Sequence, residues 1–483
     1  MNVLQVSAEI FPLLKTGGLA DIAGALPAAL GSAGCDVRVL LPGFAPIMAD
    51  LQDREAEFEL TAPWGGTVIL RKGRLASLNV VAYVIDAPHL YCRAGGPYED
   101  AYRQPHADNH RRFGLLGFAA ARLAGGLDAA WQPQVVHSHD WHAGLTSAYM
   151  ACAPSPKPRV ASVFTVHNLA YQGVFDAQCF VDLGLPSRVF SVDGLEFYGQ
   201  ISFMKAGLAY SDRITTVSPT YAREIQTPEQ GCGLDGLLRA RGWALSGILN
   251  AVDESVWSPA HDALIPKSYD SQKIVGKAQC RAVVQQELGL TVQGDAPVFG
   301  VVSRLTEQKG LHLVLAGLDA LVARGGQLVL LGTGDSWLEN AFRERAVAHP
   351  HAVSVRIGYD EGYAHRVFAA SDVTLVPSRF EPCGLTQMYG LKYGSLPLVH
   401  RVGGLADTVV DCTIEDLAEG LSNGFAFYEF TQHAFERAVS RAFTLYANRP
   451  EWSRVRTRGM QQALGWDAAA LQYVALYRAA AGI

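Results

Sequence analysis

Short apolar segments recur along the chain and are separated by longer amphipathic stretches, and this alternation limits the possible fold more than any other feature. In the first half the segments lie at residues 3–7, 37–41, 135–138, 162–166, 213–217 and 246–249. In the second half they lie at residues 297–303, 327–331, 353–357, 373–377 and 396–400, with a helical pattern over 311–323. Near-continuous apolar strands that alternate with helices are typical of parallel sheets covered on both faces. The sequence therefore predicts an α/β protein built from two Rossmann-like halves.

The alternation breaks once, between residues 250 and 267. There Pro259 and Pro266 flank polar and charged residues and would interrupt a helix. We place a linker in this segment and predict an N-terminal domain over residues 1–253 and a C-terminal domain over 254–462. An amphipathic helix in residues 463–483 ends the chain, and it could pack on the second domain or cross back to the first. A length of 483 residues agrees with two large domains at about 150 residues or more each.

Composition excludes several classes of protein. Hydrophobic residues make up 49% and charged residues 18%, which is too apolar for a disordered chain, and the formal charge of −6 argues against nucleic acid or an anionic membrane as a partner. The eight cysteines include no Cys-x-x-Cys pair, and the chain opens on an apolar strand without a basic and apolar leader. We expect a cytoplasmic protein with reduced thiols.

The loop after the first strand is a candidate phosphate site. Ligands of open α/β sheets bind beyond the carboxyl ends of the strands, and Lys15, Gly17 and Gly18 lie there just before a helix. Helix N-terminal amides and an ammonium group both favour a phosphate. The alternative is an ordinary glycine turn with a solvated lysine.

Arg304 and Lys309 occupy the corresponding position in the second half, and two cations five residues apart could straddle a diphosphate. The alternative is a pair of surface charges, although cations near a helix start oppose the helix dipole.

The segment 377–386 follows another predicted strand and contains Glu381, Pro382, Cys383 and Gly384. Pro382 is tolerated at a helix start, and Gly384 leaves amides free to face a ligand. Glu381 would then be a carboxylate at the edge of the sheet, or alternatively a cap of the following helix.

Histidines gather at two further strand ends. His137 and His139 alternate as in metal-dependent hydrolases, but that arrangement belongs to a barrel with later ligands, whereas the strands here predict two open sheets. The sequence also contains no Asp-x-Asp pair, so a metal-bridged diphosphate is unsupported. His167 and Asn168 follow the strand over 162–166, where a lone histidine is often structural. A metal hydrolase therefore stays as a minor alternative.

Six motifs, taken together, resemble the bacterial glycogen synthase and plant starch synthase family of retaining glucosyltransferases. They are Lys15-Thr16-Gly17-Gly18-Leu19, His139-Asp140-Trp141-His142-Ala143-Gly144, Thr165-Val166-His167-Asn168, Leu249-Asn250-Ala251-Val252-Asp253, Ser303-Arg304-Leu305-Thr306 with Gln308-Lys309-Gly310, and Ser378-Arg379-Phe380-Glu381-Pro382-Cys383-Gly384-Leu385-Thr386-Gln387. The resemblance covers nearly the whole chain and implies the GT-B architecture, in which two Rossmann-like domains face each other across a deep cleft.

The resemblance also implies roles for individual residues. ADP-glucose would lie in the cleft, with its diphosphate held by Arg304, Lys309, the loop from Lys15 to Gly18 and the amides that follow Cys383. The other implied positions are Glu381 at the donor glucose hydroxyls, His167 beside the anomeric carbon, Tyr359 near the adenine, Asp140 and Asn250 around donor and acceptor, and Gly384, Leu385 and Thr386 along the phosphates. Position 389 is Tyr389, where many retaining GT-B enzymes have a second glutamate, and this departure fits the glycogen synthase branch.

The implied reaction transfers glucose, with retention, from ADP-glucose to the non-reducing end of glycogen or another α-1,4-glucan. The resemblance implies no metal or other cofactor, so Arg304 and Lys309 would neutralise the departing ADP. The alternatives are a starch synthase-type enzyme that uses UDP-glucose, a sugar-nucleotide epimerase on the same fold, and a non-catalytic protein that senses ADP-glucose or binds glucan.

Overall fold

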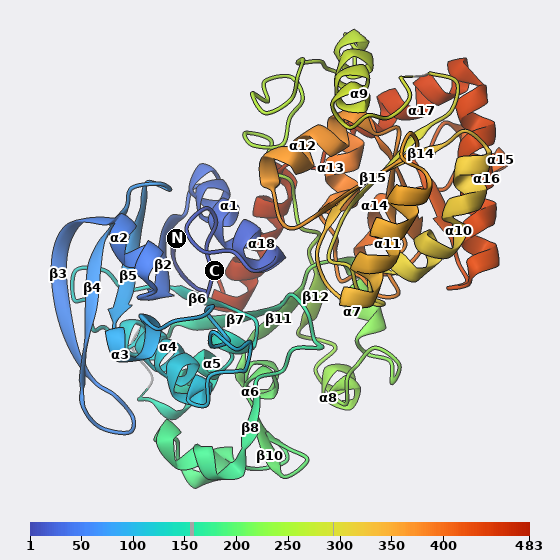
Figure 1. Ribbon diagram of the computed structural model, residues 1–483. Helices are drawn as coiled ribbons and strands as arrows, with labels where there is room; N and C mark the ends of the chain where they lie inside the picture. Colours follow the sequence, from blue (N-terminus) through green and yellow to red (C-terminus); the bar gives the residue numbers. More distant parts are fainter. Residues whose placement is uncertain (155–158, 293) are drawn as a thin grey trace. The chain divides into compact units, whose positions relative to one another are not determined.

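The computed structural model describes residues 1–154, 159–292 and 294–483. The chain forms two compact units, one from Met1–Asn250 with Trp466–Ile483 and the other from Ala251–Gly465 (Figure 1). Both are α/β, as the alternation of apolar segments predicts. In the described parts of the chain we find no helix with the length and apolar character that crossing a membrane requires.

The first unit is built on a nine-stranded sheet with the order β12-β11-β7-β6-β1-β2-β5-β4-β3. Its strands are β1 (Asn2–Val6), β2 (Asp36–Pro42), β3 (Leu51–Thr61), β4 (Thr67–Leu75), β5 (Val80–Asp86), β6 (Val135–His139), β7 (Ala161–Val166), β11 (Arg213–Thr216) and β12 (Leu245–Gly247). The strands from β12 to β5 are parallel, and β6 and β7 are buried along their whole length. A small antiparallel sheet adds β8 (Val174–Asp176), β10 (Gln200–Ser202) and β9 (Glu196–Phe197).

Helices join these strands. They are α1 (Gly18–Ser32), α2 (Ala45–Asp50), α3 (Pro88–Tyr91), α4 (Asn109–Ala124), α5 (Leu145–Cys152), α6 (Phe203–Tyr210), α7 (Pro219–Glu224), α8 (Asp235–Ala240) and the C-terminal α18 (Trp466–Ala481), with a short 3-10 helix, η1 (Trp141–Ala143), after β6. The C-terminal α18 packs against α1 and over β6 and β7, so the end of the chain belongs to the first unit (Figure 1).

The second unit contains a six-stranded parallel sheet with the order β15-β14-β13-β16-β17-β18. Its strands are β13 (Val298–Val302), β14 (Gln327–Gly332), β15 (Val353–Ile357), β16 (Val373–Val376), β17 (Leu396–His400) and β18 (Phe425–Phe427). Its helices are α9 (Val275–Glu287), α10 (Leu311–Ala323), α11 (Ser336–Ala348), α12 (Glu361–Ala370), α13 (Thr386–Lys392), α14 (Gly403–Thr408), α15 (Ile414–Glu419), α16 (Gln432–Ala447) and α17 (Arg449–Gln461).

All eleven segments expected as strands are strands, and their bounds agree to within two residues at either end. The pattern missed β3 and β4, which pair antiparallel at one edge of the first sheet, the three short strands β8, β9 and β10, and also β5 and β18 (Figure 1). In β3 the charged residues outnumber the apolar ones and most positions are exposed, because this edge strand has little apolar surface to bury.

The units divide after Asn250 and after Gly465, whereas the sequence placed the divisions after residues 253 and 462. The physical reason is a pairing between the two connecting segments. The Val252 N–H donates to the Leu464 carbonyl at 2.8 Å, and Val252 bridges to Gly465 in parallel. The predicted linker is packed rather than free, since Trp257 stacks on His365 with ring centroids 3.8 Å apart.

Candidate active site

The loop between β1 and α1 gathers the first three candidate residues. A Cβ on Gly17 or Gly18 would meet no heavy atom within 4 Å, so these glycines leave the start of α1 open. Among the described residues no side chain caps this helix, and its first amides are available to an anion. Lys15 is not a solvated side chain, because its Nζ lies 2.7 Å from Asp21 Oδ1. The loop therefore has the open amides of a phosphate site, with its lysine held by a carboxylate.

Glu9 organises this loop and was not among the predicted site residues. Its side chain is 2% exposed and accepts hydrogen bonds from the Thr16 N–H at 2.6 Å, the Thr16 hydroxyl at 2.5 Å and the Tyr98 hydroxyl. A buried carboxylate needs such donors, because burial without partners is costly. Tyr98 therefore anchors the loop, whereas Tyr102 is 86% exposed. A carboxylate three residues beyond a buried strand is the signal that would have indicated Glu9.

Asp140 connects the ends of β6 and β7 in a strained conformation. Its backbone has φ 55° and ψ −178°, a region that costs a residue other than glycine on the order of 1–3 kcal/mol. Its Oδ1 accepts the His167 N–H at 2.7 Å and the Asn168 N–H at 3.4 Å. Burial nevertheless raises the pKa of Asp140 to about 7. The structure therefore brings Asp140 and His167 together at the carboxyl edge of the first sheet.

Behind His167 lies a chain of buried histidines. His139 Nδ1 is 3.0 Å from His167 Nε2, and the rings of His137 and His139 have centroids 4.1 Å apart. The ring nitrogens of His137 are 2.7 Å from the Tyr477 hydroxyl of α18 and 2.6 Å from the Thr165 hydroxyl. Because both of its nitrogens are already hydrogen-bonded, His137 is arranged as a support for the site and not as a metal ligand.

Burial keeps these histidines neutral. It lowers the pKa of His137, His142 and His167 to about 3 and that of His139 well below its usual value. His167 therefore presents an uncharged imidazole at neutral pH.

The depressed pKa of His142 predicts acid sensitivity. The unfolded chain binds a proton at this side chain below about pH 6.5, whereas the folded chain does so only near pH 3, so stability falls as the pH is lowered through this window. His142 stacks on Tyr98 and its Nδ1 is buried without a partner in the described residues, so His142→Phe keeps the packing. We expect the stability of this variant relative to the wild type to rise by about 1.4 kcal/mol per pH unit as the pH falls from about 6 to 4.

Urea unfolding at a series of pH values measures this slope. His433→Phe, which replaces an exposed histidine of α16, is the matched control and should leave the slope unchanged. Equal slopes for His142→Phe and the wild type would contradict the prediction.

Asn250 follows β12, at the end of the first unit's main segment. Its N–H donates to the Val217 carbonyl at 3.3 Å, and its Oδ1 is buried without a hydrogen-bond partner in the described parts of the chain. This amide oxygen is an unused acceptor.

In the second unit, Lys309 and Glu381 form an ion pair. Lys309 Nζ lies 2.6 Å from Glu381 Oε2, and the Ser378 hydroxyl donates to the same oxygen at 2.8 Å. Glu381 is 8% exposed, and within the described residues its Oε1 accepts no hydrogen bond. Glu381 therefore offers one oxygen to a ligand hydroxyl while Lys309 and Ser378 hold the other.

Arg304 is the exposed member of this group. Its guanidinium makes a long contact of 3.4 Å with Gln308 Oε1. The Gln308 amide donates to the Phe380 carbonyl at 2.9 Å, which connects the loop after β13 to the loop after β16. The structure thus brings Arg304, Lys309 and Glu381 to the same carboxyl edge of the second sheet.

Two glycines allow these loops to approach closely. Gly310 has φ +70°, and a Cβ there would lie 1.9 Å from the Pro377 carbonyl oxygen. Gly403 has φ +45°, and its Cβ would lie 1.9 Å from the Glu381 carbonyl oxygen. Gly403, at the start of α14, was not predicted as a site residue, because the sequence does not show which loop it approaches.

The helix after Glu381 begins too far along the chain for Glu381 to cap it, which was the alternative prediction for this residue. The first residue of α13 is Thr386 and its N-cap residue is Leu385, so Glu381 does not cap the helix and Pro382 is not at its start. Gly384 has φ +76°, a left-handed conformation that favours glycine. Cys383, Gly384, Leu385 and Thr386 therefore form the turn that leads from Glu381 into the helix.

Tyr359 lies between β15 and α12 and is 72% exposed. Its hydroxyl donates to Glu361 Oε2 at 2.5 Å. Its ring is thus displayed beyond the carboxyl end of β15, and the adenine contact implied by the resemblance stays a prediction.

Comparison with known proteins agrees with this arrangement. Residues 2–240 match the family described as the starch synthase catalytic domain, and residues 289–455 match glycosyl transferases group 1. A glycogen synthase of Variovorax paradoxus is 63% identical to this chain, with 99% of each covered. The chain belongs to the glycogen synthase family.

Other members of the glycogen synthase family and a related structure show the same similarity. A glycogen synthase of Leptothrix cholodnii is 58% identical over 99% of both chains. The catalytic domain of starch synthase IV from Arabidopsis thaliana, solved with ADP and acarbose, is 29% identical and superposes with a TM-score of 0.90, covering 100% of this chain and 99% of that one. The two-domain α/β structure is therefore consistent with the GT-B architecture.

Proposed function

We propose that this protein elongates an α-1,4-glucan such as glycogen by transferring glucose, with retention, from ADP-glucose to the non-reducing end and releasing ADP. Membership of the glycogen synthase family supports the reaction class, and the related starch synthase structure was solved with ADP. The observation that carries the assignment of roles is the Lys309–Glu381 pair at 2.6 Å, at the same carboxyl edge of the sheet as Arg304.

The second unit would hold the donor. Negative charge develops on the leaving diphosphate as the glycosidic bond breaks, and donors aimed at that charge usually supply the largest catalytic term. Arg304 and Lys309 provide the positive charge, and the turn from Cys383 to Thr386 provides backbone amides. Glu381 Oε1 would accept a hydroxyl of the donor glucose, and Tyr359 would lie near the adenine.

The first unit would serve the acceptor side and the reacting carbon. His167, neutral and held by the Asp140 carboxylate through its backbone N–H, would lie beside the anomeric carbon. Asn250 would contact the acceptor glucan. The loop from Lys15 to Gly18 would contact the diphosphate of the donor.

Retention then follows from attack on the face that the leaving group departs from. Glu381 is proposed to accept a hydrogen bond from a hydroxyl of the donor glucose, so it is not the nucleophile of a covalent intermediate, and no other nucleophile is evident. In this mechanism stabilisation of ADP is the main catalytic task, and we propose that no metal or other cofactor takes part.

The test incubates the purified protein with glycogen and either ADP-glucose or UDP-glucose, in EDTA, and follows nucleotide release together with chain growth. With ADP-glucose that carries radiolabelled glucose, we expect the label to enter glycogen at the same rate as ADP is released. A higher rate with UDP-glucose would show that UDP-glucose and not ADP-glucose is the donor. Conversion of the sugar nucleotide to its epimer without growth of the glucan would indicate an epimerase. Dependence on a divalent metal would contradict the proposed mechanism.

A further inference from the structure

A second cationic site lies in the unit formed by Ala251–Gly465, at the opposite edge of its sheet from Arg304 and Glu381. A cavity of about 450 Å³ is lined by α9, α17 and the residue that precedes β16, Asp372. The Asp372 N–H donates to the Val298 carbonyl at 2.8 Å, and Val298 is the first residue of β13. The cavity is therefore at the amino ends of β13 and β16, whereas the residues proposed to bind the donor follow the carboxyl ends.

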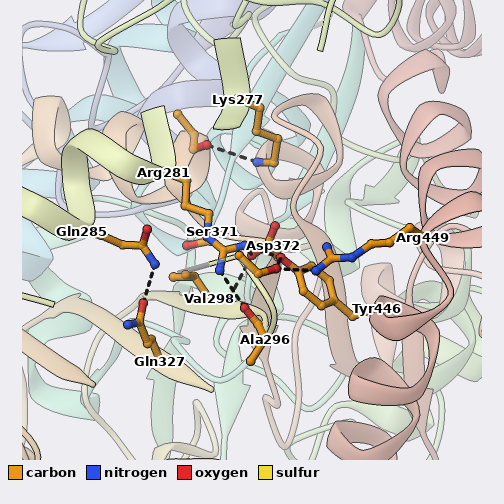
Figure 2. Close-up of polar contacts among 12 residues, drawn as sticks. Lys277, Arg281, Gln285, Ala296, Val298, Gln327, Ser371, Asp372, Tyr446 and Arg449 are labelled. Atoms are coloured by element: carbon orange, nitrogen blue, oxygen red, sulfur yellow. Dashed lines mark hydrogen bonds and ion pairs between the residues drawn. The ribbon is translucent and has the colours of Figure 1, made fainter. Parts of the chain in front are cut away.

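The charged residues that line this cavity are predominantly positive. Four cations face one carboxylate, that of Asp372, among the lining residues that the structure describes; the cations are Lys277, Arg281, Arg449 and Arg456. Figure 2 shows Arg281, Asp372, Tyr446 and Arg449 lying together. Burial, together with the positive charges of Arg456 and Arg281, lowers the pKa of Lys277 to about 7, although the Asp372 carboxylate acts to raise it. The cavity therefore has an excess of positive charge.

Two of the cations are already used by the fold. Lys277 Nζ donates to the carbonyls of Tyr393 at 2.8 Å, Ala369 at 3.2 Å and Phe368 at 3.3 Å. Arg281 donates to Asp372 Oδ2 and to the Ala296 carbonyl, both at 2.7 Å. These side chains connect α9 to the sheet and contribute positive charge to the cavity.

The two arginines of α17 differ from them. Arg449 stacks on Tyr446, with its guanidinium 3.7 Å from the ring centroid, and donates to the Gly294 carbonyl. Arg456 makes one long hydrogen bond of 3.4 Å, to Ser453 on its own helix, and its buried Nε has no partner among the described residues. Positions 449 and 456 are two helical turns apart, which puts both side chains on the same face of α17.

A guanidinium carries five N–H donors, and leaving them unpaired in a partly buried place costs free energy. An anion with several oxygens would satisfy Arg456 and relieve the mutual repulsion of the lining cations. Planar guanidinium groups match phosphate oxygens in pairs, which favours phosphate over a halide.

We propose that the cavity between α9 and α17 binds a phosphate group, either as free orthophosphate or as part of a phosphate monoester. Arg456 and Arg449 contact the phosphate oxygens, and Arg281, with the protonated fraction of Lys277, supplies background charge. This site is separate from the donor site, and it does not depend on the function proposed above.

The experiment measures binding of inorganic phosphate and of glycerol 3-phosphate to the full chain by calorimetry at constant ionic strength. Arg456→Gln removes the charge that faces the cavity. Arg454→Gln is the matched control, because Arg454 lies on the same helix, is exposed and pairs with Glu451 instead. Thermal unfolding of each variant reports on folding, and binding of ADP reports separately on the donor site.

We expect Arg456→Gln to weaken phosphate binding by about tenfold or more, as the loss of charge-assisted hydrogen bonds implies, with ADP binding unchanged. Arg454→Gln should bind phosphate as the wild type does. Weakening for both probes would show that the phosphate group alone is recognised, and weakening for orthophosphate alone would identify a free anion as the ligand.

Phosphate binding that is absent from the wild type, or that is unaffected by Arg456→Gln, would overturn the proposal. If Arg456→Gln does not fold, Arg449→Gln provides the same comparison, because Arg449 lies on the same face of α17.

Discussion

Replacing Lys309 with alanine is expected to lower the turnover of glucan elongation by about 10²-fold or more. The loss follows from removing one preorganised donor from a leaving group on which charge develops. In the described structure Lys309 also pairs with Glu381 at 2.6 Å, so the substitution leaves that carboxylate with Ser378 as its donor. The loss of the cation and the loss of the partner of Glu381 both affect the bound ADP-glucose. Arg304→Ala should reduce turnover by a comparable factor, because it removes a positive charge that stabilises the leaving ADP but does not disturb Glu381.

The measurement is kcat and KM for ADP-glucose with saturating glycogen. Lys267→Ala, which removes an exposed lysine of the same unit, is the matched control and should retain wild-type turnover. Thermal unfolding distinguishes lost chemistry from lost folding, because removing one member of a buried ion pair destabilises a protein. Near wild-type turnover in well-folded Lys309→Ala and Arg304→Ala would remove both residues from the proposed mechanism.

The sequence predicted most of the parallel strands because their apolar and β-branched residues form short runs between amphipathic stretches, although β5 and β18, which are also parallel, were missed. Strands β15 and β17 were predicted with their observed bounds. The antiparallel pair β3 and β4 was missed, because an edge strand needs few apolar residues and β3 is largely charged. Periodicity also left open where the last helix packs, since an amphipathic face does not identify its partner. In the structure that partner includes His137, which contacts Tyr477.

The predicted site residues lie at the carboxyl ends of their strands, because the fold class alone puts them there. The sequence does not show which other residues position these site residues. Glu9 supports the Lys15 loop through partners 7 and 89 positions away. Gly403 approaches the Glu381 carbonyl from a loop that follows another strand. Such contacts depend on register and backbone conformation, which motif spacing does not contain.

Replacing Glu381 with glutamine is expected to reduce turnover by an amount similar to that of the lysine variant. The carboxylate receives Lys309 and Ser378 on Oε2, which leaves Oε1 for a hydroxyl of the donor glucose. Glutamine keeps the shape but loses the charge, so it weakens the contact to Lys309 and makes one of the two side-chain atoms a donor. Because α13 begins at Thr386, a helix-capping role does not account for such a loss.

A double-mutant cycle separates a shared role from two independent ones. If Lys309 and Glu381 act as a unit, the double variant loses much less than the product of the single losses, because each single substitution already disrupts the pair. Glu419→Gln, at an exposed position at the end of α15, is the matched control and should retain full turnover. A Glu381→Gln variant that keeps more than about half of the wild-type turnover would leave Glu381 with a structural role only.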